Sequence, residues 1–156
     1  MSFKYIFTLL ILISFHSFCQ SISSFFPKSS EVLLSINCDF NYDGIDDIIC
    51  VTEDTVSLDR TLFFFKGLDF NNFKVVARND TLIMRSYDGG MLGDPFYGMN
   101  YSEDTLIILF YGGTSWRWNY EYQYCYDRKN SEWFLFKEIY DLINLNNIED
   151  IDDTTS

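Results

Sequence analysis

Short apolar runs that alternate with polar turns occupy most of the chain. Runs rich in Val, Ile, Leu, Phe and Tyr are separated by clusters of Asn, Asp and Gly, a pattern typical of β-strands and their turns. The expected strands lie near residues 32–38, 47–53, 61–66, 73–78, 81–85, 104–111, 115–126 and 132–139. Because most of the turns are short, as antiparallel hairpin connections are, the sequence predicts a mainly β protein with a single antiparallel β domain, sandwich- or open-barrel-like and rich in hairpins.

Two of these segments carry information about packing. Residues 104–111, DTLIILFY, are apolar on both faces, so we expect this strand in the centre of a sheet and covered on both sides. Residues 115–126, SWRWNYEYQYCY, alternate strictly and place Trp116, Trp118 and the tyrosines on one face. That face is either the core side of a half-buried strand or a platform on which a sugar stacks. We favour the tyrosines inside, with Trp116 or Trp118 at the rim.

The beginning of the chain reads as a signal peptide. Residues 1–19 have a positive Lys4, then an apolar run too short to span a bilayer comfortably, then small residues before a cut at Gln20. We therefore expect an exported protein, periplasmic or secreted. Lipidation of Cys19 is not expected, because bulky Phe18 stands where lipoprotein signals carry a small residue. No later stretch is long and apolar enough for a membrane span.

The chain after the expected signal peptide divides into three segments. Residues 20–31 form an N-terminal lead-in, 32–140 the β domain and 141–156 an acidic C-terminal tail. Between 139 and 148, Leu142, Leu145 and Ile148 recur every third residue, which allows a short helix before the tail.

The mature chain is strongly acidic. Without residues 1–19 it has 10 basic and 23 acidic residues, a formal net charge of −13, and no histidine. Such a surface repels nucleic acid and anionic membranes, so neither is an expected partner. It suits a cation binder or a partner of something basic, and we expect a monomer.

Three cysteines remain after Gln20. Cys38 and Cys50 flank an acidic loop, and a disulfide across it is possible. The alternative, which we favour, is that Cys38, Cys50 and Cys125 are small buried thiols, since one bridge cannot be the scaffold of so aromatic a chain.

The stretch DFNYDGIDD, residues 39–47, carries the clearest chemistry. Calcium binds six to eight oxygens, and a tightly curled loop supplies them from side chains at its positions 1, 3 and 5, a backbone carbonyl at 7 and a further side chain at 9. Those positions hold Asp39, Asn41, Asp43, Ile45 and Asp47. Gly44 stands at position 6, where the loop turns sharply and needs positive φ. The sequence therefore predicts a Ca²⁺ site between the first two strands.

This stretch resembles the calcium loops of dockerins, of thrombospondin type 3 repeats and, most closely, of FG-GAP or VCBS-type β-propeller blades, where the loop links two antiparallel strands. It occurs once here, so no propeller is implied. An EF-hand has a bidentate Glu at position 12, but this chain has Cys50, which favours fewer protein ligands and an affinity of about 0.1–1 mM. The segments ARND, DGGMLGDPF and YGGTSWRW are similar to those of small uncharacterised exported bacterial proteins, a resemblance that implies no activity.

A second candidate site is a ligand rim built from Gly-rich turns. Asp88, Asp94, Arg117 and Arg85 lie in or beside these turns, near Trp116 and Trp118 in the sequence, and would meet as a polar ligand site. The alternative is that they cap turns and pair at the surface, as Asp in turns often does.

An enzyme is not expected. The mature chain lacks histidine, the common general base and transition-metal ligand, so Ser-His-Asp and Cys-His schemes are excluded. We expect an exported, calcium-binding β domain that is a non-catalytic binding module for a glycan or protein. The alternatives are an inhibitor or immunity-type protein whose acidic surface docks on a basic enzyme, and a small carbohydrate-active enzyme with a carboxylate pair.

Overall fold

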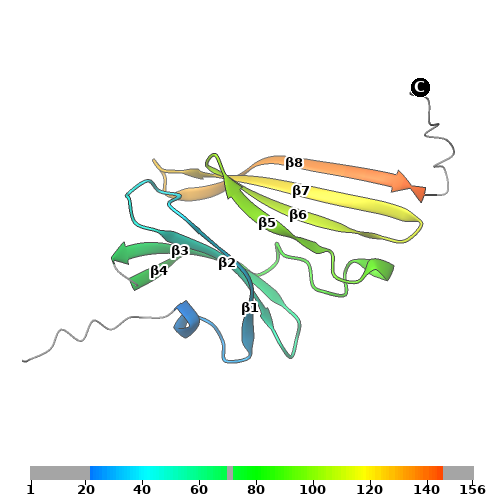
Figure 1. Cartoon of the computed structure of the whole chain (residues 1–156), viewed down its shortest axis with the longest axis horizontal. Helices are drawn as coiled ribbons and strands as arrows, with labels where there is room; N and C mark the ends of the chain where they lie inside the picture. Colours follow the sequence, from blue (N-terminus) through cyan, green and yellow to red (C-terminus); the bar gives the residue numbers. More distant parts are fainter. Residues whose placement is uncertain (1–21, 70–71, 146–156) are drawn as a thin grey trace, which may run out of the picture.

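A computed structural model describes residues 22–69 and 72–145, and within them eight strands form two antiparallel sheets of four (Figure 1). The N-terminal sheet has the order β1 (Ser30–Cys38), β2 (Asp47–Asp54), β3 (Arg60–Asp69), β4 (Asn72–Asn79). The C-terminal sheet has the order β5 (Phe96–Ser102), β6 (Thr105–Gly113), β7 (Trp116–Asp127), β8 (Glu132–Asn144). Two short 3-10 helices, η1 (Ile22–Phe25) and η2 (Gly90–Leu92), lie outside the sheets. The expected antiparallel β domain is confirmed in its sandwich form, and the sheets do not close into a barrel.

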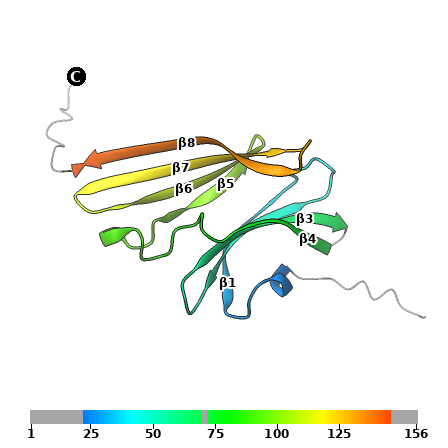
Figure 2. The same ribbon diagram turned by 180° about the vertical axis from the view of Figure 1, so that it is seen from behind.

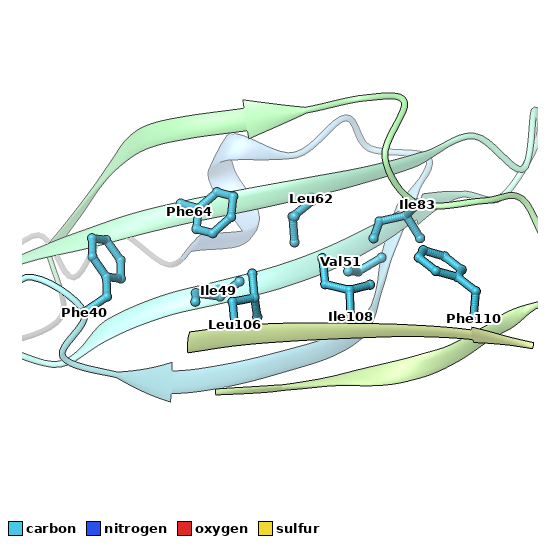
Figure 3. Close-up of a cluster of buried hydrophobic side chains, with 9 residues drawn as sticks. All are labelled: Phe40, Ile49, Val51, Leu62, Phe64, Ile83, Leu106, Ile108 and Phe110. Atoms are coloured by element: carbon cyan, nitrogen blue, oxygen red, sulfur yellow. The ribbon is translucent and has the colours of Figure 1, made fainter. Parts of the chain in front are cut away.

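The core lies between the two sheets. The inward residues of β2 and β3 face those of β6, and all are nearly inaccessible to solvent (Figure 3). The cluster consists of Phe40, Ile49, Val51, Leu62, Phe64, Ile83, Leu106, Ile108 and Phe110. Each strand contributes alternate residues, as a half-buried strand should.

The outer face of the N-terminal sheet has its own small apolar cluster. Cys50, Phe63 and Phe65 are buried there beneath η1 and the residue after it. The ring of Phe26 lies 5.2 Å from that of Phe63 and 5.8 Å from that of Phe65, in the tilted and edge-on geometries that aromatic pairs prefer. The N-terminal lead-in is therefore a packed part of the domain.

The strand predicted over 81–85 is wrong. The side chain of Asn79 accepts hydrogen bonds from the N–H groups of Thr81 and Leu82, both at 2.9 Å, and so turns the chain out of β4. The segment then crosses to the second sheet as an irregular connection that buries Ile83 in the core. The next strand, β5, was not predicted, because Gly98 and Asn100 weaken its strand pattern.

The C-terminal sheet differs from expectation in two further places. A helix over 139–148 is wrong for the part that the structure describes, because β8 continues to Asn144, which lies opposite Trp116 of β7. The central position of β6 is confirmed, but its coverage on both sides is wrong. Leu106 and Ile108 are fully buried on its inner face, whereas Tyr111 on the outer face is exposed.

The two ends of the chain bear on localisation. The expected signal peptide, the cut before Gln20 and the tail beyond residue 145 lie outside the described residues. In the described part, no helix has the length and apolar character needed to cross a membrane.

Figure 2 shows the same two layers from behind, with β8 along the outer side of the C-terminal sheet.

Candidate metal centre

The acidic loop connects β1 to β2, as predicted, and it is tightly curled. The carboxylate of Asp39 accepts hydrogen bonds from the backbone N–H groups of Asp43, at 3.2 Å, and Gly44, at 2.8 Å. The Oδ1 atom of Asn41 accepts from the same Asp43 N–H at 3.0 Å. Gly44 has φ +81°, in the left-handed region that favours glycine. Positions 1, 3 and 5 of the loop are thus folded toward one another.

Asp43 has a counter-ion in this structure. Its Oδ2 atom lies 2.9 Å from the Nζ atom of Lys66 on β3, and its Oδ1 atom accepts the N–H of Ile45 at 3.0 Å. The hydrogen bond from Lys66 lowers the pKa of Asp43, and the same bond raises the pKa of Lys66. Both side chains are about one-third exposed, so this pair is partly screened by water.

Asp47 has a different environment, because it is completely buried, with 0% exposure. Its Oδ2 atom accepts the N–H of Phe40 at 3.2 Å and the Nδ2 of Asn41 at 2.9 Å, while Oδ1 accepts the N–H of Gly67 at 2.8 Å. Burial raises the pKa of Asp47, and the nearby charges of Asp43 and Asp39 add to this. The Asp47 carboxylate therefore links the loop to β3, and it also lies near the carboxylates of Asp39 and Asp43.

Gly67 makes this junction possible, and no local pattern in the sequence indicates it. A Cβ atom on Gly67 would lie 2.4 Å from the backbone oxygen of Asp46 and 2.7 Å from Cγ2 of Ile45. Real Cβ atoms do not approach backbone that closely, so the loop packs on β3 only because residue 67 is glycine.

The loop also contacts the C-terminal sheet through Tyr42. The Tyr42 hydroxyl donates to the carboxylate of Asp104 in the β5–β6 turn. The guanidinium of Arg128, in the β7–β8 turn, lies 3.8 Å from the centre of the Tyr42 ring and 3.2 Å from Asp104 Oδ2. Three turns at one end of the sandwich are thus tied together by a hydrogen bond, an ion pair and a cation–π contact.

The donor set fits a hard cation in type and sequence order. Asp39, Asn41 and Asp43 carry side-chain oxygens within one curled turn. A calcium loop would also use the backbone carbonyl at position 7, which is Ile45. In the described residues, no three Asp, Glu, Cys or His side chains converge on one point. Asp39 and Asp43 instead bind N–H groups and Lys66, so a cation would have to displace Lys66 and draw these oxygens inward.

An open cleft of about 700 Å³ adjoins the loop on the outer face of the N-terminal sheet. Its apolar lining includes Ile48, Leu68 and Phe73, and its polar lining includes Asp46 and Asp69. The loop itself contributes Gly44 through Asp46 to the wall. The sequence did not predict this cleft, because its residues come from β1, β2, β3, β4 and the loop.

The residues of the predicted ligand rim are engaged elsewhere. Asp94 makes two hydrogen bonds, 2.7 and 2.6 Å long, to the buried guanidinium of Arg60, whose Nε also binds Glu53. Asp88 accepts the backbone N–H of Arg85 at 2.9 Å, and Nη1 of Arg117 lies 3.5 Å from the Gly113 oxygen. Asp88 therefore caps a turn, as in the alternative, whereas Asp94 pairs with a buried arginine and not at the surface.

The tyrosines of β7 lie on the core side, as we favoured. Tyr120, Tyr122 and Tyr124 pack against the core between the sheets, and Trp118 packs there too. Trp116 is 51% exposed and begins the strand at the rim.

The cysteines in the described residues are free thiols. Cys38 lies opposite Asp47 and packs on the core, whereas Cys50, opposite Ser35, lies on the other face of the sheet. The two side chains point to opposite faces, so no bridge spans the loop. Burial raises the pKa of the Cys38 and Cys50 thiols to about 12.

Comparisons of the chain with models of protein families, with curated proteins and with solved structures gave no match.

Proposed function

We propose that this chain is an exported β domain that binds one calcium ion in loop 39–47 and acts as a non-catalytic binding module. The observation that carries the proposal is the curled loop around Gly44, in which Asp39, Asn41 and Asp43 approach one another in the spacing of a calcium loop. Asp47 takes part through the remaining lone pair of its Oδ1 atom or through a bound water.

The proposed role of the ion is to stabilise the fold. The loop joins two strands of one sheet, with no pair of helices that would swing apart on binding. Without the ion, Lys66 is the cation paired with Asp43, and the carboxylates of Asp39 and Asp47 remain close to Asp43. A calcium ion would neutralise this cluster and hold the loop against β3 and the turns of the C-terminal sheet.

The proposed partner surface is the cleft beside the loop. Apolar Ile48, Leu68 and Phe73 with acidic Asp46 and Asp69 favour a protein segment that carries basic and apolar side chains. The net charge of −13 of the mature chain favours the same class over a neutral glycan, and it supports the inhibitor-type alternative, in which the target is a basic enzyme.

Calorimetric titration tests the ion. The mature protein should bind one calcium per chain with a Kd of about 0.1–1 mM, as weak extracellular sites do. Asp43→Ala should abolish the binding heat. The matched control is Asp46→Asn, which removes an exposed charge one residue before Asp47 and no proposed ligand. Absence of calcium heat in the unaltered protein at millimolar ion would refute the proposal.

A further inference from the structure

The edge strand β8 carries an unusual concentration of exposed apolar side chains. Six of them are each between 46% and 62% exposed: Phe134, Leu135, Phe136, Tyr140, Leu142 and Ile143. The other edge strands, β1, β4 and β5, carry only one or two such residues each within the described chain. No strand lies beyond β8 in the described residues, and Figure 1 shows it along the whole outer side of its sheet.

A long apolar edge of this kind is a template for pairing with another strand. We infer that β8 pairs antiparallel with β8 of a second copy of this chain, joining the two C-terminal sheets into one sheet of eight strands. The inference is independent of the calcium site, and it replaces the monomer expected from the sequence.

The symmetry of such a pair restricts its register. A two-fold axis perpendicular to the sheet keeps each face on its own side, so residues opposite each other must come from the same face. Lys137, Ile139 and Asp141 share the outer face, because they lie opposite Gln123, Glu121 and Asn119 of β7. Glu138 and Tyr140 share the inner face with Tyr122 and Tyr120.

Only a two-fold axis through Ile139 places Lys137 opposite an acidic residue of the second copy without placing like charges opposite each other. It sets Lys137 opposite Asp141 of the second copy, twice, and Ile139 opposite Ile139. An axis at Lys137, Glu138 or Asp141 would set two like charges directly opposite, which is destabilising. An axis at Tyr140 would set Asp141 opposite Ile139 and leave Lys137 without an acid.

The two charged residues are available for this pairing. Lys137 is exposed and forms no ion pair within the described residues. Asp141 is exposed, and its Oδ2 atom accepts a hydrogen bond from Nδ2 of Asn119 at 3.0 Å. Phe136 has no partner in β7, because the register shifts between Gln123 and Tyr124, so the regular pairing around this axis covers the segment from Lys137 to Asp141.

The test uses charge exchange and sedimentation velocity on the purified mature protein over a range of concentrations. The unaltered protein should sediment as a dimer at tens of micromolar. Lys137→Asp and Asp141→Lys should each weaken dimerisation about tenfold or more, because each sets like charges opposite in two places. The double variant Lys137→Asp/Asp141→Lys should dimerise again, and an equimolar mixture of the two single variants should form heterodimers.

The control is Lys129→Asp, which makes the same charge change in the exposed β7–β8 turn and should leave the dimer intact. Circular dichroism of each variant checks that the fold is kept. A monomer at all concentrations would overturn the inference. So would a dimer that Lys137→Asp does not weaken, or one that the double variant does not restore.

Discussion

The guanidinium of Arg128 lies 3.8 Å from the centre of the Tyr42 ring, although 85 positions separate the two residues in the chain. Tyr42 stands within the candidate calcium loop and Arg128 in the β7–β8 turn, so this contact joins the two sheets at one end of the sandwich. Tyr42 adopts φ +62°, which its position in the curled loop imposes and its contacts with Arg128 and Asp104 offset.

Replacing Tyr42 should loosen this junction. Tyr42→Ala removes both the hydrogen bond to Asp104 and the ring beneath Arg128, and should cost about 1 kcal/mol of stability, a modest value because Tyr42 is 54% exposed. Tyr42→Phe keeps the ring and should lose about half as much. Chemical denaturation of both variants measures this. Equal stability of Tyr42→Ala and the unaltered protein would show that the junction contributes nothing.

Gly67→Ala should damage the loop from the side of β3. The added methyl group would meet the Asp46 backbone oxygen at 2.4 Å, so the loop must shift and the Gly67 N–H bond to Asp47 must lengthen. We expect a loss of about 1–3 kcal/mol and weaker calcium binding. Leu68→Ala, at the exposed neighbouring position, is the control. Unchanged stability and affinity in Gly67→Ala would contradict the described packing.

Lys66→Met should strengthen calcium binding. The ammonium group lies 2.9 Å from Asp43 Oδ2 and competes with a cation for that oxygen. Because exposed ion pairs are weak, its removal should lower the calcium Kd only about two- to fivefold. Lys28→Met removes an exposed charge from the lead-in and should leave the Kd nearly unaltered. A Kd in Lys66→Met that rises or does not change would argue against Asp43 as a ligand.

Ionisation of Asp54 should make the stability of the protein depend on pH in the acid range. The hydrogen bond from Ser29, with those from the N–H groups of Ser57 and Val56, lowers its pKa from 3.8 to about 2. A lowered pKa means that the ionised form favours folding, so this contribution is complete above pH 3.8 and disappears as the pH falls through about 2. Asp54→Asn should therefore melt below the unaltered protein near neutral pH, and the difference should shrink through that window. A difference independent of pH would contradict the assignment.

Local residue patterns in the sequence predicted most of the strands correctly. Seven of the eight expected strands overlap strands of the structure, because each has either strict alternation or a long apolar run bounded by turn residues. The position of the acidic loop between β1 and β2, and the positive φ of Gly44, also follow from local residue types.

The errors occurred where tertiary contacts outweighed local propensity. Residues 81–85 have apolar content, but the Asn79 side chain turns the chain and the core takes up Ile83. Residues 96–102 contain Gly98 and Asn100, yet pairing with β6 makes them a strand. Residues 139–144 have helical spacing, but β7 is long enough to pair with all of them.

The surroundings of the candidate site had no local signal. Lys66 and Gly67 lie about twenty positions after the loop, in a stretch that reads only as a strand. Their roles depend on β3 lying beside β2, which brings Lys66 to Asp43 and the Gly67 N–H to Asp47. Strand order is a property of the whole fold, so these partners appear only with the structure.

The central claim is that loop 39–47 binds calcium, and a crystal structure of the mature protein grown with millimolar calcium tests it most directly. We expect one ion at about 2.3–2.6 Å from side-chain oxygens of Asp39, Asn41 and Asp43 and from the Ile45 carbonyl, with Lys66 displaced from Asp43. Asp47 should join directly or through a water. A loop that remains without an ion, with Lys66 still paired to Asp43, would contradict the claim.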